Sequence, residues 1–187
     1  QYAKWLDILG VSTMESLHSL VSRGASNDVI QISEALHSQW LSHLAEMIAT
    51  NKDIRLICIA GPSASGKTTT AQRLRIQIQV FGKRAFMVSL DDYFVEREKT
   101  PKDEKGNYDF EALEALDLDL INDNLIKLID GYEVELPRFN FFTGRRERGR
   151  TVRLDKNTII IVEGIHGLNE SISQSVPEAQ KWRLYVS

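Results

Sequence analysis

The chain has 187 residues, with 23 Lys and Arg against 26 Asp and Glu, and its formal net charge is −3. This balance argues against sequence-independent binding of nucleic acid, because such binding needs a surplus of basic side chains to displace counterions from phosphates. No apolar run approaches the roughly 20 residues that a membrane-spanning helix needs, and the single cysteine, Cys58, cannot form an internal disulfide. We therefore expect a cytoplasmic protein with neither nucleic acid nor a membrane as its partner.

The first fifty residues are expected to form helices. Ser12 and Glu15 have the spacing of a capping box, and Gly24 suits a helix C-terminus. Apolar residues then recur at helical spacing, which predicts one long amphipathic helix that ends near Ala49. No chemical motif occurs in this stretch, so we interpret residues 1–50 as an N-terminal helical or connecting segment.

Beyond residue 50 the pattern is that of alternating strands and helices. A nearly continuous apolar run at 54–60 is typical of a parallel strand covered on both faces. A glycine-rich turn separates this run from a helix expected at 67–81. The elements expected after it are a strand at 85–90, a helix at 118–128, and strands at 158–162 and 183–186. This order predicts a three-layer α/β domain with a parallel sheet over residues 51–187.

The turn after the first strand carries the main chemical motif. Residues 61–68, GPSASGKT, match the pattern GxxxxGK[ST] in the strand–turn–helix context that a phosphate-binding P-loop requires. Glycines at both ends of the motif allow backbone angles that turn successive N–H groups toward phosphate oxygens. Lys67 is expected to reach the β- and γ-phosphates of ATP, and the Thr68 hydroxyl to ligate Mg²⁺. The expected ATP-binding residues are Gly61, Ser63, Ala64, Ser65, Gly66, Lys67, Thr68 and Thr69.

Carboxylates follow two of the other predicted strands. Asp91 and Asp92 come directly after the strand at 85–90, and Glu163 follows the strand at 158–162. The carboxyl ends of parallel strands are where open α/β sheets bind ligands. Because neighbouring strand residues point to opposite faces, we expect one of the two aspartates to enter the site, although a solvated turn or a helix cap is the alternative. Glu163 follows an apolar run, where a charge needs a partner such as a metal ion.

Five stretches in this order resemble the phosphoribulokinase and uridine kinase family of P-loop kinases. They are GPSASGKTT at 61–69, SLDDYF at 89–94, NYDFEALEALD at 107–117, ELPRFNF at 135–141 with two arginines after it, and VEGIHGLN at 162–169. The resemblance covers about residues 54–187. It implies ATP-dependent transfer of a phosphoryl group to a sugar hydroxyl, which in uridine kinases is the 5′-OH of a nucleoside.

The resemblance also implies roles for single residues near the phosphates. Asp91 matches the carboxylate that accepts the proton of the acceptor hydroxyl, and it would act together with Lys67 of the P-loop. Glu163 matches an acid of the magnesium site, so Thr68 and Glu163 are the expected metal ligands. This set agrees with what phosphoryl transfer needs, since that reaction depends on positioning and on neutralising charge more than on covalent catalysis.

Three further residues are implied on the acceptor side. Asp109 matches a carboxylate that holds the ribose. Phe139 stands where uridine kinases typically carry a tyrosine, and it can stack on a base without donating a hydrogen bond; Gly144 stands where they carry a histidine. Arg146 lies in the basic stretch 145–150 and is the expected contact to substrate or phosphate, although the charge pattern alone favours an exposed basic loop.

The acceptor stays open at this point. A nucleoside is the leading hypothesis, and the alternatives are a phosphopentose, pantothenate, or a regulatory P-loop protein that binds nucleotide without kinase activity. The resemblance also implies a C-terminal lid helix and a further strand, which do not occur up to Ser187, so we expect a C-terminally truncated kinase domain. A homo-oligomer is left open too, because Trp5, Trp40 and Trp182 suit either a core or an interface.

Overall fold

The structure, a computed structural model, describes the backbone of residues 2–187 and the side chains of residues 4–187. The chain divides into two compact units, residues 1–45 and residues 46–187, and the boundary falls within a long helix. The sheet and every residue of the candidate site belong to the second unit.

The N-terminal unit is helical, as the apolar periodicity predicts. It contains α1 (Tyr2–Leu9), α2 (Met14–Ser22) and most of α3 (Ser26–Thr50). The predicted capping box at Ser12 and Glu15 is wrong by one residue, because Thr13 adopts the extended N-cap conformation and pairs with Ser16. Each of these two hydroxyl groups accepts a hydrogen bond of 3.1 Å from the other residue's backbone N–H. No helix in the described part of the chain is long and apolar enough to cross a membrane.

Four parallel strands form the central sheet of the second unit. They are β1 (Leu56–Ala60), β2 (Ala85–Ser89), β5 (Ile159–Glu163) and β6 (Lys181–Tyr185). The strand order is β2-β5-β1-β6, which confirms the predicted α/β class with a parallel sheet. β1 and β5 occupy the two central positions and are buried along their whole length, which explains why their sequences are continuous apolar runs.

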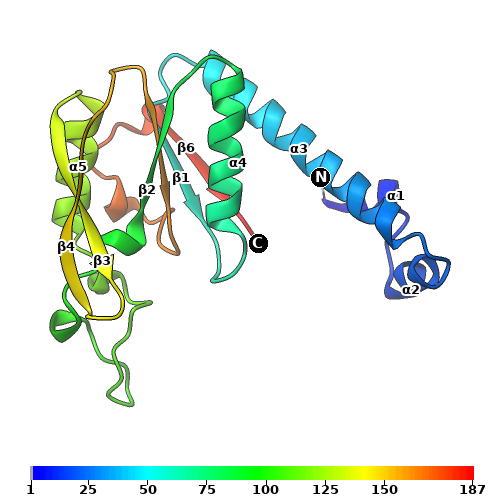
Figure 1. Cartoon of the computed structure of the whole chain (residues 1–187), viewed down its shortest axis with the longest axis horizontal. Coiled ribbons are helices and arrows are strands. Elements are labelled where there is room, and N and C mark those ends of the chain that lie inside the picture. Colours follow the sequence, from blue (N-terminus) through cyan, green and yellow to red (C-terminus); the bar gives the residue numbers. More distant parts are fainter. Residues whose placement is uncertain (1) are drawn as a thin grey trace. The chain divides into compact units, whose positions relative to one another are not determined.

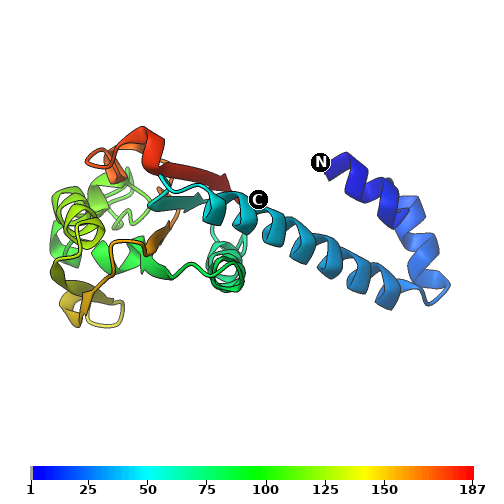
Figure 2. The same cartoon turned by 90° about the horizontal axis from the view of Figure 1, so that it is seen from above.

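Helices cover both faces of this sheet. α4 (Lys67–Val80) and α5 (Leu118–Ile129) lie on opposite sides of it in both views (Figure 1, Figure 2). Leu56 and Cys58 of β1 pack in one apolar cluster with Leu125 of α5. Ile57, between them in the strand, points to the other face and is fully buried there. The domain therefore has the three layers that the sequence predicts.

The carboxyl ends of the strands place the acidic residues at one edge of the sheet. Ser89, the last residue of β2, is in register with Glu163, the last residue of β5. β2 ends one residue earlier than predicted, and a 3₁₀ helix over Leu90–Tyr93, called the acidic turn here, follows it. The expectation that strand alternation separates Asp91 from Asp92 is therefore wrong, because both lie in this turn.

An antiparallel hairpin follows α5, and the sequence analysis does not predict it. Its strands are β3 (Glu133–Asn140) and β4 (Arg145–Arg153). In β3, buried Val134 and Leu136 flank exposed Glu135, which is the period of a half-buried strand. β4 is mostly exposed and rich in arginine, so its composition resembles that of a loop. The alternative interpretation of 145–150 as a basic loop is therefore wrong.

Candidate active site

The P-loop motif forms the tight connection between β1 and α4. Gly66 is the N-cap of α4 with a φ of +85°, and Ala64 also has a positive φ, +59°. Because Gly66 has no side chain that could cap the helix, the amide groups of the first turn are available to an anion. The Lys67 ammonium group hydrogen-bonds to the carbonyl oxygen of Pro62 at 2.6 Å. The loop thus combines backbone donors, the positive end of a helix and a cation.

Gly61 is required by the packing of this loop against the end of β6. A Cβ atom at this position would overlap the carbonyl oxygen of Val186 and would lie 2.8 Å from Ser65 Oγ. The Val186 backbone is held in place by a hydrogen bond of 2.8 Å from its N–H to the carbonyl oxygen of Ala60. The first glycine of the motif therefore serves a close backbone approach.

Gly61→Ala is expected to lower the free energy of unfolding by about 2–3 kcal/mol, because neither backbone can move without disturbing the sheet. Urea denaturation measures this change. Gly66→Ala is the matched control: no atom lies within 4 Å of its Cβ position, so only the left-handed backbone opposes the substitution, at a cost of about 1 kcal/mol. Equal destabilisation by the two substitutions would contradict the assigned clash.

Glu163 is the buried centre of the site. Its side chain belongs to a residue only 6% exposed, and both carboxylate oxygens accept hydrogen bonds from hydroxyl groups. Thr68 Oγ1 donates to Oε2 at 3.2 Å, and Ser89 Oγ donates to Oε1 at 3.0 Å. Ser89 is a site residue that the sequence analysis misses, although its place at the end of a strand, opposite Glu163, is a usable signal.

These oxygen atoms fit a Mg²⁺ site. Mg²⁺ binds to oxygen ligands, usually one or two carboxylates together with substrate phosphates. Thr68 lies in the first turn of α4, directly after the P-loop, so a hydroxyl and a carboxylate meet beside the phosphate-binding loop. The structure thus brings together the two residues that the sequence predicts as metal ligands.

The acidic turn adds two carboxyl groups with different surroundings. Burial raises the pKa of Asp91, and the negative charge of Glu163 raises it further, while the Lys67 ammonium group opposes the change. Burial also raises the pKa of Asp92, whose Oδ1 accepts a hydrogen bond of 3.4 Å from the Phe139 N–H. Asp91 therefore interacts with the residues around the P-loop, whereas Asp92 contacts the hairpin.

Asp109 caps a backbone turn shortly before the 3₁₀ helix Leu113–Ala115. Its Oδ1 accepts hydrogen bonds from the N–H groups of Glu111, at 2.9 Å, and of Ala112, at 3.1 Å. Its Oδ2 makes no hydrogen bond within the described part of the chain. One carboxylate oxygen thus fixes the side chain, and the second is available to a ligand.

Phe139 belongs to a cluster of aromatic rings. Its ring centroid lies 5.5 Å from that of Phe94 and 5.1 Å from that of Phe141, both in edge-on arrangements. Phe139 is 4% exposed, whereas Phe141 is 58% exposed. The ring surface that this cluster presents to solvent therefore belongs to Phe141, a residue of the ELPRFNF stretch for which no role was predicted.

Arg146 bridges the hairpin to the start of α5. Its guanidinium group donates to Asp117 Oδ2 at 2.8 Å and to the carbonyl oxygen of Phe94 at 3.2 and 3.3 Å. Asp117 is also the N-cap of α5, where Oδ1 accepts a hydrogen bond of 3.1 Å from the Leu120 N–H. The predicted substrate-binding arginine is thus already bound to protein groups. Asp117 precedes an apolar helical run, so a capping signal could have identified it.

The chain matches the model of the Phosphoribulokinase / Uridine kinase family over residues 56–183. It is 28% identical over 130 residues to a uridine kinase from Halobacterium salinarum, a match that covers 70% of this chain and 55% of that protein. It is 36% identical over 110 residues to a uridine kinase from Chloroflexus aurantiacus, with 59% of this chain and 51% of that protein covered. The chain thus spans about half the length of these curated relatives.

A solved structure supports the fold. It is described as that of a possible uridine kinase from Bacillus stearothermophilus, with a TM-score of 0.61, 24% sequence identity and coverage of 78% of each chain. At this identity the likeness concerns the fold alone. The family match extends from the first residue of β1 into β6, and so includes the P-loop, the acidic turn and Glu163. The chain therefore belongs to the phosphoribulokinase and uridine kinase family of P-loop kinases.

Proposed function

We propose that residues 51–187 form the nucleotide-binding core of a kinase that transfers a phosphoryl group from ATP to a sugar hydroxyl, and that residues 1–50 form a separate helical segment. One observation carries the proposal. Thr68, in the first turn after the P-loop, donates a hydrogen bond of 3.2 Å to Glu163 at the end of β5, and the charges of Lys67 and Glu163 both act on nearby Asp91. This arrangement supports the proposal that Lys67 binds phosphate, that Glu163 is an acid of the metal site and that Asp91 accepts the proton.

Each group has a distinct role in this proposal. The P-loop amides and Lys67 bind the triphosphate of ATP. Thr68 and Glu163 would hold Mg²⁺, which when bound neutralises negative charge on the phosphates. Asp91 accepts the proton of the attacking hydroxyl, and its raised pKa makes the carboxylate a stronger base than an ordinary exposed aspartate.

The proposed acceptor hydroxyl is the 5′-OH of a nucleoside. Support comes from the relatives, which are named uridine kinases, and from two further side chains. The available Oδ2 of Asp109 suits a ribose hydroxyl, and the exposed ring of Phe141 offers a surface on which a base can stack. Arg146 is proposed to position the hairpin, because its donors are bound to Asp117 and Phe94.

An acceptor panel tests the proposal. ADP release from ATP in the presence of Mg²⁺ is measured with uridine, cytidine, ribulose 5-phosphate and pantothenate, and the phosphorylated product is identified by mass spectrometry. We expect a nucleoside to stimulate ADP release and to gain a phosphoryl group at the 5′ position. Stimulation by ribulose 5-phosphate or pantothenate alone would replace the nucleoside assignment. Tight ATP binding with no response to any acceptor would favour a regulatory nucleotide-binding protein instead.

A further inference from the structure

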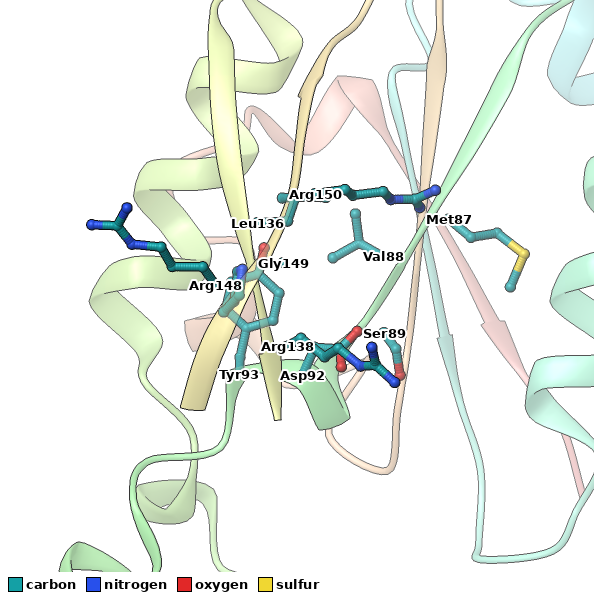
Figure 3. Close-up of a pocket in the computed structure, with 11 residues that line it drawn as sticks. Met87, Val88, Ser89, Asp92, Tyr93, Leu136, Arg138, Arg148, Gly149 and Arg150 are labelled. Atoms are coloured by element: carbon teal, nitrogen blue, oxygen red, sulfur yellow. The ribbon is translucent and has the colours of Figure 1, made fainter. Parts of the chain in front are cut away.

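A tight turn follows the buried strand β5. It spans residues 164–167, called the GIHG turn here, and begins directly after Glu163. The Gly167 N–H closes it with a hydrogen bond of 3.1 Å to the carbonyl oxygen of Gly164. Ser89, which marks the end of β2 in Figure 3, is in register with Glu163. The GIHG turn therefore starts at the edge of the sheet that holds the candidate site.

Two glycines pack the GIHG turn closely against its surroundings. A Cβ atom at Gly164 would lie 2.7 Å from Leu90 Cβ in the acidic turn, and one at Gly167 would overlap the carbonyl oxygen of Ile59 at the end of β1. That oxygen also accepts a hydrogen bond of 3.2 Å from the Gly164 N–H. Close packing on both sides leaves the backbone little freedom, so His166 is carried on a rigid support.

The His166 ring contacts the loop that contains Asp109. This loop, residues 107–112, is called the Asp109 loop here. His166 Nε2 lies 2.7 Å from the carbonyl oxygen of Glu111. Because a carbonyl oxygen only accepts hydrogen bonds, the ring must carry a proton on Nε2 and donate it. The Glu111 N–H in turn donates to Asp109 Oδ1 at 2.9 Å. A single backbone residue thus connects the imidazole ring to the carboxylate.

The other contacts of the Asp109 loop are to nearby parts of the chain. The Asp109 N–H donates to the carbonyl oxygen of Pro101 at 2.8 Å. The Phe110 ring packs edge-on against Phe94, with 5.5 Å between the ring centroids. His166, by contrast, is 55 residues away from its partner in the sequence. Its hydrogen bond therefore joins the Asp109 loop to the carboxyl end of β5, where the metal-site acid is expected.

We propose that His166 is a positioning residue, which through Glu111 holds the Asp109 carboxylate in a fixed place relative to Glu163. This role rests on the proposed function, in which Asp109 binds a ribose hydroxyl of the acceptor. His166 itself touches neither ATP nor the acceptor. Without its hydrogen bond, the acceptor has to order the Asp109 loop when it binds, and this ordering lowers its affinity. The P-loop keeps its own contacts, so ATP binding is unaffected.

His166→Asn and His166→Gln test the proposal as a pair. The amide nitrogen of glutamine can take the place of Nε2, whereas the shorter asparagine cannot reach the Glu111 carbonyl oxygen. We expect His166→Asn to raise KM for uridine about tenfold, the effect of one lost hydrogen bond. Its kcat and its KM for ATP should stay within about twofold of the unsubstituted values, since the lost contact holds the acceptor equally before and during the reaction.

Glutamine should restore KM for uridine to within about threefold of the unsubstituted value. His43→Asn in α3 is the matched control and should change none of these constants, because His43 is exposed and lies outside the kinase domain. A misfolded fraction would lower kcat and leave KM unchanged, so the two effects are distinguishable. An equal rise in KM with both substitutions at His166 would show that the hydrogen bond is not what acts, and would overturn the proposal.

Amide hydrogen exchange of the ¹⁵N-labelled chain tests the contact without turnover. The N–H groups of Glu111 and Ala112 both donate to Asp109. His166→Asn should speed their exchange about tenfold, and His166→Gln should keep it slow. Unchanged exchange in His166→Asn, or faster exchange with an unchanged KM for uridine, would overturn the positioning role. If the unsubstituted chain phosphorylates no acceptor, the proposed function fails, and the exchange rates still decide whether His166 holds the loop.

Discussion

Lys67→Ala is expected to lower kcat/KM for ATP-dependent phosphoryl transfer by about 10²- to 10³-fold, which corresponds to the loss of one well-placed charged donor. The ammonium group of Lys67 lies over the P-loop, where it hydrogen-bonds to Pro62, and it is one of the charges that act on Asp91. Its removal takes away the only side-chain cation of the GPSASGKT motif. Steady-state kinetics with varied ATP, together with calorimetric titration of a non-hydrolysable ATP analogue, measure the effect.

The control for this substitution is Lys127→Ala on α5. Lys127 forms a half-exposed pair of 2.7 Å with Asp123 one helical turn away, so its removal takes away a cation outside the candidate site. We expect its kcat/KM to stay within about twofold of the unsubstituted value. Unchanged turnover and unchanged affinity for the ATP analogue in Lys67→Ala would refute the phosphate-binding role of the motif.

Local physical constraints explain why the P-loop could be predicted in detail. The segment from Leu56 to Val80 has little conformational freedom. It consists of a strand that is buried on both faces, a turn that needs glycine, and a helix that begins at a fixed residue. The close approach of Gly61 to the Val186 carbonyl oxygen is a different kind of constraint, because it joins positions far apart in the chain. Only the three-dimensional structure shows that contact.

The hairpin could not be predicted, because the contacts that join it to the rest of the domain involve residues far away in the sequence. β4 is largely exposed, and its sequence does not alternate strictly between apolar and polar residues. It is held by tertiary contacts such as those of Arg146 with Asp117 and Phe94. Sequence patterns describe neighbours along the chain, so they identified Arg146 as a notable residue and could not show what it binds.

Asp91→Asn is expected to lower kcat by about 10²- to 10⁴-fold, the usual contribution of a general base, while the affinity for the ATP analogue changes by less than about twofold. Asparagine keeps the shape of the side chain but cannot accept the proton. Burial and the charge of Glu163 disfavour the ionised form of Asp91 in the folded protein. The variant should therefore be no less stable to heat than the unsubstituted chain, and a lower Tm would indicate that the effect on kcat arises from misfolding.

The pH dependence follows from the direction of the same shift. The base must be ionised, and its pKa is raised above the usual 3.8, so the rate should fall about tenfold per pH unit once the pH drops below this raised value. In a plot of rate against pH, the fall on the acid side (the acid limb) should thus begin at a higher pH than an unperturbed aspartate would produce. The acid limb should be absent from the pH dependence of the residual rate of Asp91→Asn. Asp92→Asn is the adjacent control, since its carboxylate contacts the hairpin, and it should retain the acid limb. An acid limb that persists in Asp91→Asn and is lost in Asp92→Asn would transfer the role of the base to Asp92.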